Sequence, residues 1–311
     1  MRSLPSAVLG LRQHVAALRI LIVFTVIFGV AYPLVITLIA HVPGLDHRAN
    51  GSTLTRNGQV VGSSLIGQSF TDSDGNALVQ YFQTRPSAAG DGYDPTASSA
   101  SNLGPESIVD TLPDPKAPKD SAAAEGKQSL LTQVCSRSLA IGKLEGVSGA
   151  RPFCTPDGVG AVLGVFYAEP SYRGPITRVV SLNQACPATP FVGTYRGVRV
   201  ECATPDTDYS AGKVVPIRGD APARSAVPSD AVTASGSGLD PAISPAYARL
   251  QEQRVAKARG ISVDQVAALV DKYQAGRALG FMGEPAVNVV ELNRALDAKY
   301  PYPQVAFHRD D

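Results

Sequence analysis

The chain has 311 residues, with 28 basic side chains against 27 acidic ones. This balance disfavours nucleic-acid binding, because proteins that bind nucleic acids normally carry a basic excess. The length allows one or two domains with hydrophobic cores of their own. The four cysteines suggest two disulfides, because their number is even and none of their spacings is the C-x-x-C of a zinc or redox site.

One apolar run near the N-terminus, residues 20–40, predicts a membrane-spanning helix. The run carries no charge, and at about 1.5 Å per residue it covers the roughly 30 Å hydrocarbon core of a bilayer. Pro33 lacks a backbone donor, so we expect a kink or a neighbour that satisfies the freed carbonyl. Because membrane helices approach closely at small residues, Gly29, Tyr32 and Pro33 are the expected packing site for a partner helix.

Basic residues lie on the N-terminal side of this run. Arg2, Arg12 and Arg19 precede it, and the first nineteen residues contain no acid. The positive-inside rule therefore places residues 1–19 in the cytoplasm and the chain from His41 onwards outside, as a single-pass protein of the cell membrane. A cleaved signal peptide is the alternative. It is disfavoured because the run is longer than the apolar part of a signal peptide and residues 37–41 contain no small-x-small cleavage pattern.

Residues 41–113 are expected to form the first part of an extracytoplasmic domain. Asn57-Gly58 stands between two short alternating runs and predicts a β-hairpin. Residues 78–83 are predicted to form a second strand, followed by loops rich in turn-forming residues. The aromatic residues before Arg85 could mark a surface that faces a ligand, or Arg85 could bond nearby loop carbonyls at a strand end. The candidate interaction residues in these loops are Arg85, Pro86, Ser87 and Asn102.

Residues 114–225 differ in character and contain all four cysteines. After a linker-like start rich in Pro, Ala and Lys, an apolar run at 159–167 and many Gly and Pro residues predict a small β-rich insertion with flexible ends. Among the three possible disulfide pairings we favour the sequential one, Cys135 with Cys154 and Cys186 with Cys202. Each short loop would contribute about 3 kcal/mol in the chain-entropy model. A pair of free thiols is the alternative.

Residues 226–311 are predicted to be the helical part of the domain, which makes the fold class α+β. Ser244 is the expected N-cap of the first helix, with a proline at the first helical position. Ser262 and Gln265 form a capping-box pattern, and Asn288 and Glu291 repeat it. The three predicted helices are 246–259, 263–275 and 289–300, and they end at Gly260, Gly276 and Pro301.

The loop Ser235-Gly236-Ser237-Gly238 invites an enzymatic interpretation, but a nucleophilic serine needs a base. Beyond the apolar run, the histidines are His41, His47 and His308. The sequence contains no G-x-S-x-G, Walker A or H-E-x-x-H motif and no closely spaced carboxylate cluster, so we predict no catalytic residues and no metal site. The interpretation by elimination is a binding or interaction module, with an extracellular hydrolase as the alternative.

Six blocks of sequence occur in one order, at residues 28–40, 62–70, 81–88, 101–105, 233–241 together with 243–260, and 276–297. Together they resemble the C subunit of the Kdp potassium-transporting ATPase. The resemblance covers residues 20–113 and 226–300 and leaves the cysteine-containing insertion unexplained. The chain departs from the family pattern at Ser99-Ala100, Ala242, Ala275 and Ala286, where the family commonly has Gly-Gly, His, Glu and Arg.

The resemblance implies a non-catalytic accessory subunit of a high-affinity, ATP-driven potassium-uptake complex. Its implied partners are a channel-like potassium-translocating subunit, a P-type ATPase subunit and a very small membrane peptide, within a lipid bilayer. The insertion is expected to be dispensable for pumping. A membrane-anchored binding protein that works without a pump is the alternative.

The resemblance also implies a catalytic chaperone that raises the affinity of the ATPase subunit for ATP, and hence nucleotide binding. ATP is cytoplasmic, however, and residues 1–19 contain no Gly-rich phosphate loop. We therefore expect this chain to bind no cofactor itself, while the complex handles ATP and potassium. Any effect on ATP affinity should then pass through the membrane helices as a coupling between sites.

Overall fold

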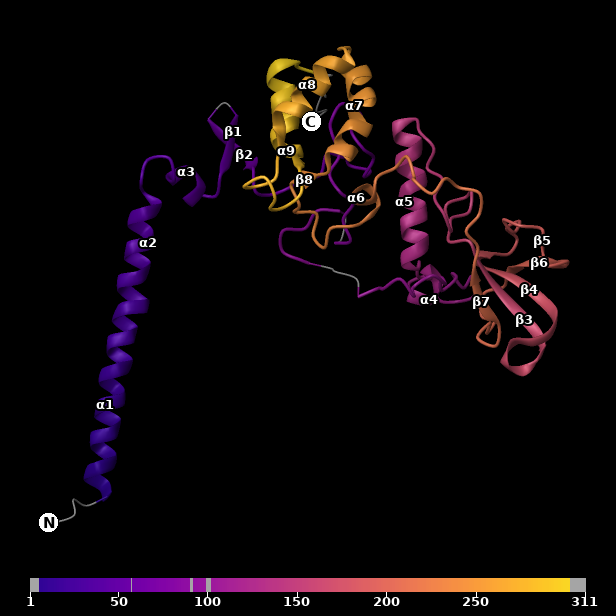
Figure 1. The fold of residues 1–311 in the computed structure, drawn as a ribbon, viewed down its shortest axis with the longest axis horizontal. Helices are drawn as coiled ribbons and strands as arrows, with labels where there is room; N and C mark the ends of the chain where they lie inside the picture. The colour runs from indigo at the N-terminus through magenta and orange to yellow at the C-terminus, as the bar shows by residue number, and fades with distance from the viewer. Residues whose placement is uncertain (1–5, 57, 90–91, 99–101, 303–311) are drawn as a thin grey trace. The chain divides into compact units, whose positions relative to one another are not determined.

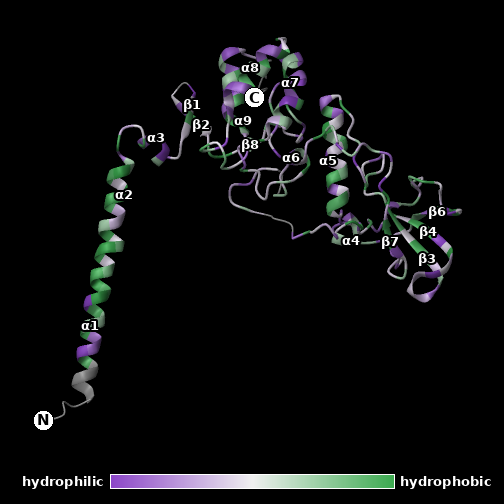
Figure 2. Cartoon of the chain, in the orientation of Figure 1, coloured by the Kyte–Doolittle hydropathy of each residue, from purple (hydrophilic) through white to green (hydrophobic). Residues whose placement is uncertain are grey.

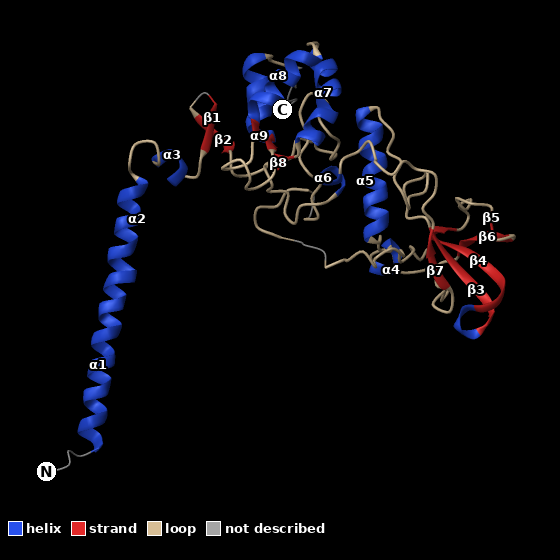
Figure 3. Cartoon of the chain, in the orientation of Figure 1, coloured by secondary structure: helices blue, strands red, loops and turns tan. Residues whose placement is uncertain are grey.

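The computed structural model describes residues 6–56, 58–89, 92–98 and 102–302. The chain divides into two compact units, Met1–Leu65 and Ile66–Asp311 (Figure 1). Helices and strands occur in both units (Figure 3), so the expected α+β class is confirmed.

The N-terminal unit begins with a long apolar helix. It consists of α1 (Ser6–Val26), a π-helical turn (Ile27–Ala31) and α2 (Tyr32–Ala40). Within it, Leu11–Ala40 is long and apolar enough to cross a membrane, and its side chains are not buried by the rest of the chain. Hydrophobic residues dominate this stretch (Figure 2). The predicted span, residues 20–40, lies entirely within it.

The expected disturbance at Pro33 takes the form of the π-helical turn. The Tyr32 N–H donates to the carbonyl of Ile27, five residues back. In a regular helix the Pro33 ring would collide with the carbonyl of Gly29, four residues back, and would leave it without a donor. A widened turn before the proline relieves this collision without ending the helix. After the turn, the Thr37 hydroxyl donates to the Pro33 carbonyl over 2.8 Å.

Beyond the short helix α3 (Asp46–Ala49), the predicted hairpin is confirmed. Strands β1 (Thr53–Arg56) and β2 (Gln59–Ser63) pair antiparallel. Asn57 lies outside the described residues. Gly58 has a φ of 80°, a conformation that glycine adopts without the steric cost that other residues pay.

The second unit contains a helical core that matches the predicted helix ends closely. The side chains of Ser244, Ser262 and Asn288 cap three helices, and Ser262 completes a capping box with Gln265. The second helix ends earlier than predicted, because residues 274–275 pair with a strand instead. The elements are α6 (Ser229–Val232), β8 (Ala242–Ile243), α7 (Pro245–Arg259), α8 (Val263–Tyr273), β9 (Gln274–Ala275), β10 (Ala286–Asn288) and α9 (Val289–Lys299).

The strand predicted at residues 78–83 is wrong. Phe82 is fully buried against the helical core, but its backbone pairs with a side chain rather than with a strand. The Phe82 N–H donates to Asn293 Oδ1 and the Asn293 Nδ2 donates to the Phe82 carbonyl, both over 2.9 Å. The next residue repeats the arrangement, because the Gln83 N–H donates to Gln251 Oε1 over 2.7 Å and Gln251 Nε2 donates to the Gln83 carbonyl over 3.1 Å.

Two arginines complete the bonding of this segment. Arg254 Nη1 donates to the carbonyls of Val79 and Tyr81 over 2.6 and 2.9 Å, and Arg259 Nε donates to the carbonyl of Gln80 over 2.8 Å. The Tyr81 hydroxyl donates to a carboxylate oxygen of Asp297 over 3.1 Å. Burial raises the pKa of Tyr81, and the negative charge of Asp297 adds to that rise. Residues 79–83 are therefore held by side chains of α7 and α9.

The cysteine-containing region holds the predicted β structure and disulfides. Its sheet has the order β5-β6-β4-β3-β7, in which β4 and β6 are parallel and the other pairs antiparallel. Cys135 pairs with Cys154 and Cys186 with Cys202, as predicted. The elements of this region are α4 (Ala122–Glu125), α5 (Leu130–Glu145), β3 (Val162–Glu169), the 3-10 turn Pro170–Tyr172, β4 (Arg173–Ala185), β5 (Thr194–Tyr195), β6 (Val198–Ala203) and β7 (Lys213–Pro216).

Helix α5 joins the sheet to the helical core, which the sequence did not indicate. Leu131 packs on a hydrophobic cluster of the sheet, whereas Val134 and Ile141 pack on the helical core. At the end of α5, Glu145 Oε1 lies 3.0 Å from Arg254 Nε of α7, and the two side chains are 0% and 7% exposed. Burial raises the pKa of Glu145, and the guanidinium of Arg254 opposes that rise. The insertion therefore contacts the helical core through α5 as well as through its two ends.

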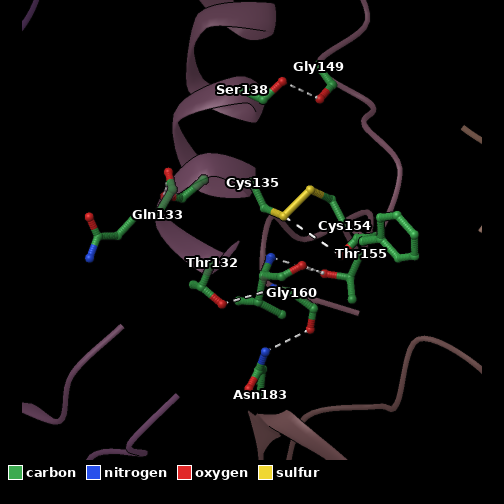
Figure 4. The surroundings of a disulfide bond; sticks show 12 residues. Thr132, Gln133, Cys135, Ser138, Gly149, Cys154, Thr155, Gly160 and Asn183 are labelled. Atoms are coloured by element: carbon green, nitrogen blue, oxygen red, sulfur yellow. Dashed lines mark hydrogen bonds between the residues drawn. A yellow bond between two sulfur atoms is a disulfide. The ribbon is translucent and has the colours of Figure 1, made fainter. Parts of the chain in front are cut away.

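The first disulfide also fixes α5 to the loop that leads into the sheet (Figure 4). Around the bond between Cys135 and Cys154, the Thr132 hydroxyl accepts from the Gly160 N–H over 3.0 Å. Asn183 Nδ2 donates to the Gly160 carbonyl over the same distance. Covalent and hydrogen bonds thus hold one side of α5, while the ion pair with Arg254 holds its end.

We expect Asn293→Leu to destabilise the protein strongly. Leucine has a similar size but would leave the buried N–H and carbonyl of Phe82 without partners, and each such group costs about 1–3 kcal/mol. The free energy of unfolding of the full chain in detergent, measured by urea titration, should therefore fall by about 2–6 kcal/mol. Gln253→Leu is the control, because Gln253 is an exposed amide on α7. Equal losses in the two variants would contradict the prediction.

Candidate functional site

Two loops that were predicted as interaction sites lie side by side, and we call residues 85–89 and 233–240 the loop junction. Ser87 and Ser235 form a parallel bridge. The Ser235 N–H donates to the Pro86 carbonyl over 2.7 Å, and the Ala88 N–H donates to the Ser235 carbonyl over 2.8 Å. The chain thus brings together residues about 150 positions apart by main-chain pairing.

The serines of the junction hold backbone groups. Ser235 is 5% exposed, and its hydroxyl oxygen accepts from the N–H groups of Gly238 and Ser237 over 3.1 and 3.4 Å. The Ser237 carbonyl accepts from the Asp94 N–H over 3.1 Å. These bonds are those of a turn held together by serine, and they give no support to a nucleophilic role.

Arg85 bonds nearby loop carbonyls, which is the second of the two roles that the sequence left open. Its Nη1 lies 2.9 Å from Asp240 Oδ2, and its Nε and Nη2 donate to the Thr233 carbonyl over 3.2 Å. The Arg85 and Asp240 side chains are 27% and 50% exposed, so the ion pair alone contributes little stability. Because these donors of Arg85 are bonded to the chain's own carbonyl, Arg85 holds the loop closed and does not present them to a ligand.

Glycines allow a third segment to approach the junction. The Gly67 N–H donates to the Leu239 carbonyl over 2.8 Å, and a Cβ on Gly67 would lie 2.6 Å from the Asp240 carbonyl oxygen. Gly238 has a φ of 75°, and a Cβ there would overlap the carbonyl oxygen of Gly92. Side chains at either position would therefore push the loops apart.

The other predicted residues lie elsewhere. Asn102 is exposed, and among the described residues no hydrogen bond joins it to the junction. Gly29, Tyr32 and Pro33 gather at or beside the π-helical turn of the apolar helix. A Cβ on Gly29 would meet only the Cγ2 of Thr25, at 3.8 Å, so this side of the helix is open to a close neighbour.

Within residues 6–56, 58–89, 92–98 and 102–302, no group of three or more His, Cys, Asp and Glu side chains could hold a metal ion. The polar network around residues 79–83, the segment that leads to Arg85, was not predicted from the sequence. The residues that could have indicated this network are two carboxamides, Gln251 and Asn293, each on the buried side of an amphipathic helix. Such residues need hydrogen-bond partners when they face a core.

We expect Gly67→Ala to loosen the loop junction without unfolding the protein. The added methyl would displace the Asp240 carbonyl and weaken the bond from the Gly67 N–H to Leu239. Amide hydrogen exchange at residues 67, 88 and 235 should accelerate at least several-fold. Gly193→Ala is the matched control, because a Cβ there would meet nothing within 4 Å. Unchanged protection in Gly67→Ala would show that the junction tolerates the displacement.

Comparison with known proteins identifies the family. The family model described as K+-transporting ATPase, c chain, matches residues 14–126 and 211–298. The matched residues include most of the apolar helix, the loop junction and helices α7 and α8.

Curated relatives share this assignment over most of their length. A potassium-transporting ATPase KdpC subunit of Mycobacterium bovis is 36% identical over 286 residues, which are 92% of this chain and 98% of the relative. The protein of the same name from Kineococcus radiotolerans is 35% identical over 94% of this chain and 96% of the relative. The one from Caulobacter vibrioides is 36% identical over 89% of this chain and 89% of the relative. Alignments of this extent must enter the interval 127–210 that the family model leaves unmatched. The chain therefore belongs to the family of the C chain of the K+-transporting ATPase.

Proposed function

We propose that the chain is a membrane-anchored accessory subunit of an ATP-driven potassium-transport complex and catalyses no reaction itself. The observation that carries this proposal is the family match, which includes most of the apolar helix and the whole loop junction. The relatives are named as subunits of a potassium-transporting ATPase. The hydroxyls and guanidinium of the loop junction are bonded to the chain's own backbone, an arrangement that suits a rigid docking part.

The proposed topology places the N-terminus in the cytoplasm and the second unit outside. Arg12 and Arg19 precede the charge-free part of the apolar helix, in agreement with the positive-inside rule. The two disulfides support the same direction, because such bonds persist in oxidising compartments outside the cytoplasm.

The proposed partners are the channel-like potassium-translocating subunit, the P-type ATPase subunit and the small membrane peptide. We place one contact at Gly29, where the helix surface is open within the π-helical turn. A partner helix could approach the backbone closely there, and close packing is what drives association between helices in a membrane.

We also propose that any effect on ATP affinity reaches the ATPase subunit through this helix contact. A chain whose folded part lies outside cannot touch cytoplasmic ATP with that part. The effect would then be an allosteric coupling, in which this subunit binds one conformation of its partner better than another.

The topology can be tested with right-side-out membrane vesicles. Protease added outside should digest the chain after about residue 50 and leave a protected fragment that contains the apolar helix. Inside-out vesicles provide the control, because there the second unit should be protected. Full protection in right-side-out vesicles would refute the proposed orientation.

We expect Gly29→Leu to weaken the association of this chain with the complex. The larger side chain would fill the open helix surface at the π-helical turn, while the chain's own fold leaves room for it. Recovery of the chain with a tagged ATPase subunit from detergent-solubilised membranes should fall several-fold.

Ala17→Leu is the control, because it enlarges an exposed small residue on the same helix away from the turn. Where the Gly29 variant is retained, the KM for ATP in potassium-stimulated hydrolysis should rise if the coupling runs through this contact. Normal recovery of the Gly29 variant would exclude this helix face as the interface. Lower recovery with an unchanged KM for ATP would separate assembly from coupling.

A further inference from the structure

The loop between β9 and β10 exposes three large apolar side chains at its end. Leu279, Phe281 and Met282 are 82%, 72% and 52% exposed. We call residues 278–282 the apolar tip. Among the described residues, none of the three belongs to a hydrophobic core cluster, so they add nothing to the packing of the fold. Single exposed apolar residues are common, whereas apolar side chains clustered on the surface are typical of interaction sites.

The backbone of the apolar tip is closed and held in one shape. The Ala278 N–H donates to the Met282 carbonyl over 2.8 Å, and the Met282 N–H donates back to Ala278 over 2.9 Å. Between them, Leu279 and Gly280 have φ angles of 52° and 81°, the left-handed pair of a tight hairpin turn. For leucine this conformation costs about 1–2 kcal/mol. The fold therefore accepts strain at Leu279, the most exposed of the three apolar side chains.

The base of the tip is polar and electrically neutral. Arg277 Nη2 lies 2.6 Å from Glu284 Oε2, and Arg277 Nη1 donates to the Gly283 carbonyl over 2.7 Å. The guanidinium thus bridges the two sides of the loop, and its charge is balanced by the adjacent carboxylate. A preformed loop with apolar side chains at its end and a neutral polar base loses little conformational entropy on binding.

We propose that the apolar tip inserts into an apolar recess on the outer surface of another subunit of the potassium-transport complex. This inference rests on the proposed function and adds a second contact to the one at the membrane helix. Three side chains are too few for a self-sufficient interface, because stable interfaces bury about 1,200–2,000 Å² in total. The tip therefore suits a partner that another contact already holds close, and the membrane helix supplies such a contact.

The same features disfavour two other partners for the apolar tip, a membrane surface and a second copy of this chain. Loops and helices that bind membrane surfaces combine apolar side chains with a basic excess that anionic lipids attract. Here the arginine at the base is paired with Glu284. A second copy of this chain would have to be held by the small tip contact alone, without the support of the membrane contact to a different subunit.

Photo-crosslinking in the assembled complex tests the proposal. A benzophenone amino acid is placed at Phe281 and, as the control, at Tyr172, which is 50% exposed on a distant turn. Irradiation of membranes that contain the complete complex should crosslink position 281 to an identified subunit of the complex, at apolar residues. Crosslinks to lipid, to a second copy of this chain, or at no more than the yield of position 172 would overturn the proposal.

A variant provides an independent measurement. Leu279→Asn removes the apolar side chain and should not destabilise the fold, because asparagine tolerates the left-handed conformation. Retention of the chain during detergent washing of the complex should fall several-fold, while its unfolding midpoint in the isolated state stays unchanged. Val214→Thr is the control, at a residue that is 43% exposed on β7.

The outcomes separate this proposal from the proposed function. If the chain is not a subunit of the complex, the unmodified chain will also fail to purify with it. If only the docking of the tip is wrong, the unmodified chain and Leu279→Asn will be retained equally, and position 281 will give no subunit crosslink.

Discussion

The fold of the second unit depends on one constraint, which is that buried backbone N–H and carbonyl groups must form hydrogen bonds. Residues 79–83 cross the helical core without a neighbouring strand, and their peptide groups would be costly to bury alone. Gln251 and Asn293 solve this problem with carboxamides, which carry a donor and an acceptor just as a peptide group does. Because α7 and α9 each supply one carboxamide, the segment also fixes the two helices relative to each other.

The consequence extends to the loop junction. Gln83 is bound to α7, and Arg85 lies two residues further along the chain. The anchored segment therefore determines the position of the Arg85 backbone, from which the guanidinium extends. Arg85 then closes on Asp240 and the Thr233 carbonyl, and Ser235 pairs with residues 86 and 88. The junction is thus a continuation of the core, built from main-chain bonds. A surface built in this way is preorganised, and preorganised surfaces lose little conformational entropy when a partner binds them.

Features that depend on neighbours in the sequence were predictable, and those that depend on distant residues were not. The caps at Ser244, Ser262 and Asn288 are local, because each side chain bonds a backbone N–H three residues ahead. The strand assigned to residues 78–83 failed because its partners come from side chains 168 and 211 positions away. Helix α5 was missed because its apolar residues serve two different cores and make no single apolar stripe. Both loops of the junction were predicted from the sequence as interaction loops, but their pairing with each other was not predicted.

The π-helical turn has a consequence for which residues of the apolar helix can share one line of contact. Its bond from Tyr32 reaches back five residues rather than four, which adds one residue to that turn. An extra residue rotates everything beyond it by about 100° around the helix axis. Side chains of α1 and α2 that a regular helix would align on one face therefore point in different directions. A partner that follows one face of α1 meets a different set of side chains on α2, so a single helix can present separate faces to two neighbours at different positions along its length.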